Sequence, residues 1–211
     1  MSLSHFQTEF DKMMNRDYFL DAVHPMRKEA FSKFLNSGLP TNKWEDWRFT
    51  NLSKLKQKKY RISETQDAPA GDVDLSSFEI DGVDTVVIYN GHYQEALSSV
   101  PSGIQLLSGI EYLERKNWEF ETAERSPFDL LNTAFMDCGM SFIVDPNINV
   151  ETPVRILFIS NGEDNIMANP RMYLDVGDSA AVTFIEHHVG NAASFFQNAS
   201  IFASVGVNGS L

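Results

Sequence analysis

The seven residues Val176-Gly-Asp-Ser-Ala-Ala-Val182 return 29 positions later as Val205-Gly-Val-Asn-Gly-Ser-Leu211. The stretch from Val150 to Ile156 has the same apolar spacing, 26 residues before the first copy, but lacks the glycine. Self-similarity at this period, in apolar segments separated by Gly and Asn turns, is typical of a β-solenoid, where each repeat adds one coil. The repeat therefore predicts a solenoid, with a β-sandwich built from similar hairpins as the main alternative.

Apolar residues in this part of the chain alternate with a period of two. Alternate side chains of a strand point to the same face, so each alternating set forms one apolar face. We therefore expect residues from about Phe142 onward to form stacked parallel strands, with these side chains pointing inward. The inward-facing residues are expected to be Val154, Ile156, Phe158, Met172, Leu174 and Val176.

Helix signals dominate the first part of the chain. Phe6, Phe10, Met13 and Met14 recur at helical spacing and give one apolar face. A second helix is predicted from Pro25, whose fixed φ suits the first helical turn, to Gly38, which suits a left-handed cap. Thr41 can cap a third, short helix.

The middle of the chain mixes strands and a helix. Thr85 to Tyr89 is a predicted strand, and Asn90-Gly91 after it favours a type I′ hairpin. Ile104 to Leu107 is another short predicted strand. Ser126-Pro-Phe-Asp129 has the serine cap, the early proline and the acidic third position of a helix start.

These signals divide the chain into two parts. Residues 1–139 are predicted to be a mixed α/β region, helical over 1–62 and with a polar linker at 63–77. Residues 140–211 are predicted to be the first, incomplete coils of the β-rich core. The second repeat copy stops at Leu211, where the first copy is just entering its strand. We therefore expect a fragment whose open last coil frays or self-associates, and whose binding competence lies beyond residue 211.

Charge and hydropathy exclude several classes of protein. The chain has 211 residues and a net charge of −12, so it repels polyanions and is not expected to bind nucleic acid. The short basic run from Lys54 to Arg61 is interpreted as a solvated surface. No apolar run is long enough to cross a bilayer, and no targeting signal opens the chain, so we predict a cytoplasmic protein without a membrane anchor.

Few residues suggest chemistry. Cys138 is the single cysteine and is interpreted as a small buried hydrophobe. Glu186-His187-His188 is the densest group of potential metal ligands, but His187 and His188 point to opposite faces of a strand, so we interpret the group as structural. Trp44, Trp47 and Phe49 could form a stacking platform, although packing within the small helical unit is the preferred interpretation.

Common catalytic signatures are missing from the sequence. It has no Walker A loop, no dinucleotide-binding glycine motif, no HExxH helix and no Cys-x-x-Cys pair. One cysteine cannot supply the thiolate set that an iron–sulfur cluster normally requires. We therefore assign no catalytic, cofactor-binding or metal-binding residue and expect a protein that is not an enzyme.

Four blocks of the sequence resemble a known family. The first is an Arg/Ala/Phe helix followed by Gly-Leu-Pro-Thr, a Lys, an acidic pair, Trp and an aromatic-Thr-Asn-Leu run, and it closely resembles the N-terminal signature of the SufD-type members of the SufB/SufD family. Three further blocks follow in the family's order. The blocks are Arg27 to Leu52, Tyr89-Asn-Gly-His-Tyr93, Phe128 to Phe135, and Pro170-Arg171 through Val176-Gly177 to Ile185-Glu186.

The resemblance implies a scaffold for iron–sulfur cluster assembly. It implies a right-handed parallel β-helix after the N-terminal region, and as partners a SufB-like paralogue and a SufC-like ATPase, with a homodimer as a further assembly. It also implies a complex that handles the cluster, iron and a reduced flavin. Family residues tied to cluster formation lie on later strands and on the partner, and the ATPase contact lies in a C-terminal domain. No such role can be transferred to a residue of this chain.

Two alternatives remain open at this stage. The nearest is the SufB paralogue, although the Gly-Leu-Pro-Thr and Tyr-Asn-Gly blocks favour the SufD type. A β-helix protein that binds or cleaves carbohydrate would also show repeated strands. Such proteins are usually secreted, and this sequence opens without a secretion signal.

Overall fold

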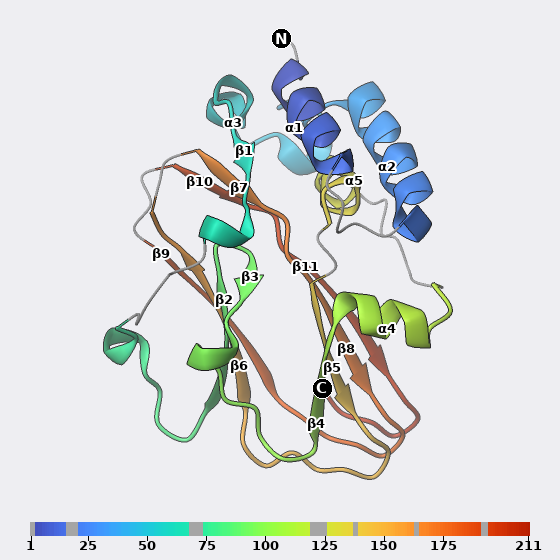
Figure 1. Ribbon diagram of the computed structural model, residues 1–211, viewed down its shortest axis with the longest axis vertical. Helices are drawn as coiled ribbons and strands as arrows, with labels where there is room; N and C mark the ends of the chain where they lie inside the picture. Colours follow the sequence, from blue (N-terminus) through green and yellow to red (C-terminus); the bar gives the residue numbers. More distant parts are fainter. Residues whose placement is uncertain are drawn as a thin grey trace.

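The computed structural model describes residues 3–15, 21–67, 74–118, 126–136, 139–162, 165–190 and 194–211. Helices α1, α2, α3 and α5 lie at one end of the molecule, and the strands extend from that end in three sheets (Figure 1). The helices are α1 (Ser4–Met14), η1 (Asp21–Val23), α2 (His24–Ser37), η2 (Glu45–Trp47), α3 (Ser53–Gln57), η3 (Thr65–Asp67), η4 (Ser76–Phe78), η5 (Glu95–Leu97), α4 (Gly109–Arg115) and α5 (Pro127–Ala134).

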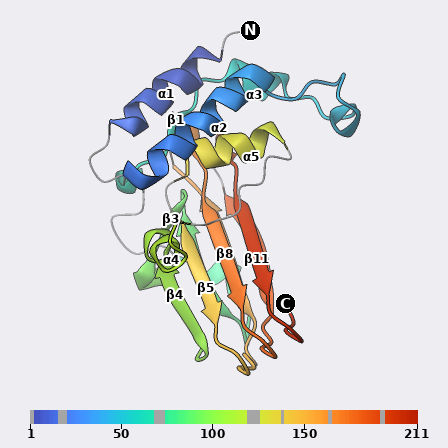
Figure 2. The ribbon, with the colours of Figure 1, turned by 90° about the vertical axis from the view of Figure 1, so that its right-hand side faces the viewer.

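The described strands form one three-stranded and two four-stranded sheets. Their orders are β1-β7-β10, β11-β8-β5-β4 and β3-β2-β6-β9. Figure 2 shows β4, β5, β8 and β11 side by side, with α4 lying across them near one edge. The strands are β1 (Arg61–Ile62), β2 (Asp84–Tyr89), β3 (His92–Tyr93), β4 (Ile104–Ser108), β5 (Met140–Val144), β6 (Val154–Ser160), β7 (Ile166–Ala168), β8 (Arg171–Val176), β9 (Phe184–Gly190), β10 (Phe195–Gln197) and β11 (Ser200–Val205).

The β-helix predicted for residues from 140 onward is wrong. The structure is a mixed α/β arrangement of three separate sheets, and none of them is closed. Each sheet includes at least one strand from before residue 140, and β3 and β4 run antiparallel to their neighbours. Sequence periodicity identifies the two faces of a strand, but it does not identify the strand that pairs with it. For this reason the sequence did not reveal that strands from residues 61–108 pair with the later strands.

The predicted parallel pairing and inward faces are confirmed. Strand β8 pairs in parallel with β5 and β11, and β6 pairs in parallel with β2 and β9. The two repeat copies lie side by side, because Val176 is the registered partner of Val205. The third copy proposed at Val150 is out of register, since the backbone N–H of Val150 bonds to the carbonyl of Ala181 and Val144 is the residue that pairs with Val176.

Steric crowding explains why each copy of the repeat has a glycine at its second position. A Cβ at Gly177 would lie 2.6 Å from the backbone nitrogen of Pro146 in the preceding turn, closer than side-chain carbons approach backbone atoms. Gly206 meets Asp178 in the same way, one repeat later. Successive turns therefore stack tightly on one another, and glycine recurs where they touch.

Apolar side chains fill the space between the two four-stranded sheets. The six residues predicted to point inward are all buried. Val86 and Ile88 from β2 join Phe158 from β6 and meet Phe142 and Leu174 from the opposite sheet. This layer is the core on which the strands pack, and burial of its large side chains stabilises the fold by about 1.5–3 kcal/mol for each.

A second core, rich in aromatic residues, joins the helices to the small sheet. Phe10 of α1 stacks on Phe31 of α2 with ring centroids 4.0 Å apart, and Phe135, just after α5, packs edge-on against both rings. Ile62 and Met167, from β1 and β7, close this core from the sheet side. The helical spacing seen in the sequence thus corresponds to a real buried face.

Local signals in the sequence have mixed outcomes. The helix ending at Gly38, the Asn90-Gly91 hairpin and the capping box of Ser126 and Asp129 are all confirmed. The short helix expected after Thr41 is only the 3₁₀ turn η2. Helix α4, which Ser108 caps, was missed because its apolar pattern is too short to stand out.

No helix among the described residues is long and apolar enough to cross a membrane.

Candidate functional site

His188 is held by contacts on both ring nitrogens. Strand alternation places Glu186 and His188 on the same face of β9, and His188 Nε2 lies 2.7 Å from Glu186 Oε1. The side-chain amide of Gln197 donates to His188 Nδ1 at 2.7 Å, and its own carbonyl accepts from Ser160 Oγ at 2.9 Å. The imidazole stacks on Phe158 at 4.6 Å. This relay orients the ring and leaves neither nitrogen free for a metal ion in this arrangement.

The remaining metal-ligand candidates do not converge. His187 lies between Glu186 and His188 on the opposite face of the strand, as alternation predicts. Across the part of the chain that the structure describes, no three His, Cys, Asp or Glu side chains gather as a metal site. The interpretation of Cys138 as a buried hydrophobe concerns a residue outside the described ranges.

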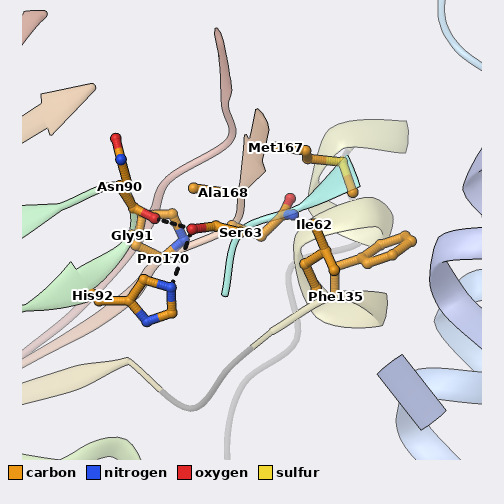
Figure 3. Close-up of a pocket in the computed structure, with 10 residues that line it drawn as sticks. Ile62, Ser63, Asn90, Gly91, His92, Phe135, Met167, Ala168 and Pro170 are labelled. Atoms are coloured by element: carbon orange, nitrogen blue, oxygen red, sulfur yellow. Dashed lines mark hydrogen bonds between the residues drawn. The ribbon is translucent and has the colours of Figure 1, made fainter. Parts of the chain in front are cut away.

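A small cavity lies beside the β2–β3 hairpin (Figure 3). Its volume is about 20 Å³, enough for one water molecule. Ser63 Oγ donates to the carbonyl of Asn90 at 2.6 Å and lies 3.1 Å from His92 Nε2. Because the serine proton is directed to the carbonyl, His92 serves as the donor to Ser63 and not as a base that would activate it. The pair fastens the hairpin to the residue after β1, a role that a lone histidine in the sequence does not reveal.

Asp67 fixes the turn next to this cavity. Both carboxylate oxygens accept from the Arg61 guanidinium at 2.7 Å, and one also accepts from the backbone N–H of Glu64. The hydrogen bond from Arg61 is the main cause that lowers the pKa of Asp67 below its ordinary value of 3.8. The Asn90 side chain then joins this turn to the opposite loop by donating to the carbonyls of Asp67 and Asn161.

Buried polar side chains connect α5 to the sheets. Asn132 is fully buried and donates to the carbonyls of Pro170 and Asn198, at 3.2 and 2.7 Å. Its own carbonyl accepts from Arg171 Nε at 3.0 Å, and Arg171 also donates to Thr133 Oγ1 at 2.8 Å. Buried polar groups are stable only when they are paired, so this network defines how the helix sits on β8.

The aromatic residues of the first family block separate in the structure. Trp47 packs on Phe128 of α5 with ring centroids 5.2 Å apart, as the packing interpretation expects. Trp44 is 40% exposed and Phe49 is 89% exposed, so the packing interpretation is wrong for these two residues. The Arg48 guanidinium lies 4.6 Å from the centre of the Phe49 ring. Beside them is a surface hollow of about 380 Å³, lined by the turn at 40–42 and the loop at 48–53.

The sequence of the chain matches one protein family. Residues 3–156 match the family described as the SufBD protein N-terminal region, which covers most of the chain. The chain therefore belongs to the SufB/SufD family, as its sequence blocks indicated.

Two curated relatives agree with this assignment. The chain is 26% identical over 193 residues to the iron-sulfur cluster assembly protein SufD of Escherichia coli, an alignment that covers 89% of the chain and 44% of the relative. It is 25% identical over 186 residues to an iron-sulfur cluster assembly SufBD family protein of Synechocystis, covering 80% of the chain and 40% of the relative. The chain thus spans less than half the length of these relatives.

Proposed function

We propose that the protein is a non-catalytic scaffold subunit in iron–sulfur cluster assembly. The observation that carries this proposal is the family match over residues 3–156, supported by relatives whose names place them in that process. The buried polar network between α5 and the sheets suits a scaffold, because it holds the helical layer and the sheets in one fixed arrangement.

Within the family, we propose the SufD type over the SufB type. The curated relative named SufD aligns along 193 residues, and the Gly-Leu-Pro-Thr and Tyr-Asn-Gly blocks point the same way. The proposal includes a SufB-like paralogue and a SufC-like ATPase as partners of the whole protein. It assigns no cofactor to residues 1–211. The iron–sulfur cluster is the cargo of the complex, and a reduced flavin is a further molecule that the complex handles.

Recovery of the partners tests this proposal. A full-length tagged form would be purified from its own cells under mild conditions, and the recovered proteins would be identified by mass spectrometry. We expect stoichiometric amounts of an ATPase and of a second SufB/SufD-family chain. An unrelated tagged protein expressed at the same level is the control. Recovery of neither chain above that control would contradict the scaffold proposal, and recovery of a second copy in place of the paralogue would contradict the heteromeric form.

A further inference from the structure

Phe49 is the most exposed large apolar residue in the described part of the chain, at 89%. It stands at the rim of the 380 Å³ hollow, in the loop between α2 and α3 that projects from the helical end of the molecule (Figure 2). The hollow lies within the usual size range of ligand pockets. An exposed Phe next to a concave site is the arrangement that interface anchors adopt.

The loop that carries Phe49 is held in place by its own contacts. Lys56 Nζ donates to the carbonyls of Leu39 and Pro40, at 3.2 and 3.0 Å, and so ties the start of the loop to α3. The backbone N–H of Thr50 donates to the carbonyl of Trp47 at 3.0 Å, and the Trp47 ring is anchored on α5. The hollow and its aromatic rim are therefore preformed, which lowers the entropic cost of binding.

The stretch of chain that supplies most of the lining of the hollow carries a charge opposite to that of the whole chain. Six of the 17 Lys and Arg residues lie between Lys43 and Lys59, a stretch that holds only two of the 29 Asp and Glu residues. Arg48 is exposed at the rim, and its guanidinium pairs loosely with Glu45 at 3.6 Å. A basic patch on a chain of net charge −12 selects acidic groups locally while the rest of the surface repels them.

We propose that this hollow binds an acidic segment of a partner protein, with an apolar side chain of that segment packed beside Phe49 and its carboxylates facing Arg48 and Lys56, the two basic residues that line the hollow. Arg48 is positioned for this task, since its guanidinium can contact Phe49 and a carboxylate at the same time. The proposal does not depend on the assembly function proposed above.

Two other classes of partner fit the geometry less well. A membrane or a nucleic acid presents an extended anionic surface, which the −12 charge of the chain opposes. The site is also hollow and partly polar, with Thr41, Asn42 and Asn51 among its lining residues, whereas membrane-binding surfaces bury an apolar face. A short segment that meets only this patch avoids most of the repulsion.

Site-specific photocrosslinking tests the proposal. A benzophenone amino acid would replace Phe49 in the full-length protein, and Ile80, which is 45% exposed, would carry the same probe as a matched control. Cross-linked peptides would be sequenced by mass spectrometry after irradiation in cells. We expect the Phe49 probe to capture one recurrent acidic peptide from another protein, and the Ile80 probe not to capture it.

Charge reversal gives the second arm. In the Phe49-probe protein, Arg48→Glu should reduce capture of that peptide by about 30-fold, the size expected for loss of an interface anchor. Glu79→Lys, an exposed reversal of charge away from the hollow, should leave capture unchanged, and both variants should keep the melting temperature of the parent because these side chains are exposed. Four outcomes would overturn the proposal. The Phe49 probe could capture no more protein than the Ile80 probe, or capture peptides that are not enriched in acidic residues. It could also capture a second copy of the chain, or capture the acidic peptide equally well in the Arg48→Glu variant. Binding of the protein to phosphatidylserine vesicles that is lost on Phe49→Ser would overturn it in favour of a membrane.

Discussion

Asp67 shows what one side chain contributes to this fold. Its carboxylate joins Arg61 of β1 to the turn that precedes residue 68, and the Asn90 side chain bonds to the carbonyl of the same residue. The sequence offers no sign of this link, because Asp67 lies in a polar stretch without periodicity. The pairing depends on how η3 turns the chain back toward β1.

The first prediction concerns this ion pair and pH. The folded-state pKa of Asp67 is below its ordinary value of 3.8, so the stability it contributes is present in full above pH 3.8 and is lost as pH falls through the folded-state value. Asp67→Asn should lower the free energy of unfolding by about 1–2 kcal/mol near neutral pH. The effect is smaller than for a fully buried ion pair, because the Arg61 side chain is 35% exposed and water screens the interaction. The cost should shrink below pH 3.8. Urea unfolding of the wild type and the variant at several pH values measures this difference in stability. If the difference stayed the same at every pH, the Asp67–Arg61 pair would not be its cause.

His188 shows how far sequence reasoning reaches at the residue scale. Alternation correctly predicts that Glu186 and His188 share a face and that His187 does not. It does not predict Gln197 and Phe158 as the neighbours of His188, because those contacts depend on which strands lie side by side. Exposure of Phe49 was missed for the same reason, since an aromatic cluster in a sequence looks the same whether it packs or projects.

The second prediction concerns metal binding by this group. Both ring nitrogens of His188 are engaged by protein atoms, so substitution should release no metal ion. We expect His188→Gln and His187→Gln to leave the iron and zinc content of the purified protein unchanged, as measured by atomic emission. The two variants control for each other because they lie on opposite faces of β9. Stoichiometric metal in the wild type that either variant loses would show that the site is real.

At the scale of elements, α5 shows what sequence can and cannot predict. Its start was predicted because Ser126, Pro127 and Asp129 form a strong local signal. Its position was not predicted, because Asn132 finds its partners Pro170 and Asn198 far along the chain. Local chemistry determines that the helix forms, and long-range hydrogen bonds determine where it packs.

The third prediction tests that network. Asn132→Leu should destabilise the protein by about 3 kcal/mol or more, because two buried carbonyls and the Nε of Arg171 lose the partner that Asn132 provides. The same substitution at Asn36, which is exposed on α2, should change stability by less than about 0.5 kcal/mol. Chemical unfolding monitored by circular dichroism gives both values. Equal effects at the two positions would show that the network does not secure the helix.

At the scale of the whole molecule, the arrangement of sheets was the least predictable feature. The repeat and the alternation correctly gave parallel strands with buried faces. They did not reveal that β1, β2, β3 and β4 belong to the same sheets as the later strands. The pattern within one strand sets which residues face the core, but it does not identify the strand that pairs with it. Strands on both sides of residue 140 therefore combine in every sheet.

The fourth prediction concerns the exposed edges of the three sheets. Strands β9, β10 and β11 each lie at the edge of their sheet, and Val205, Val207 and Leu211 are exposed nearby. Open strand edges with apolar neighbours invite pairing with another chain. We expect residues 1–211 either to self-associate through this edge or to exchange the amide hydrogens of β9 to β11 rapidly.

Light scattering over a range of concentrations, together with hydrogen exchange, distinguishes these outcomes. Val207→Lys should suppress association by placing a charge at the edge, while the same change at exposed Ile80 should not. A monomer in which β9 to β11 are well protected would contradict the edge argument.

The activity of cluster-dependent enzymes in living cells tests the proposed role in iron–sulfur cluster assembly most directly. The gene would be deleted, and the activity of several iron–sulfur enzymes would be measured relative to the amounts of their polypeptides. We predict that activity per polypeptide falls, that enzymes without a cluster are unaffected, and that the full-length protein restores the loss. Unchanged activity per polypeptide in the deletion strain under iron limitation and oxidative stress would contradict a role in iron–sulfur cluster assembly.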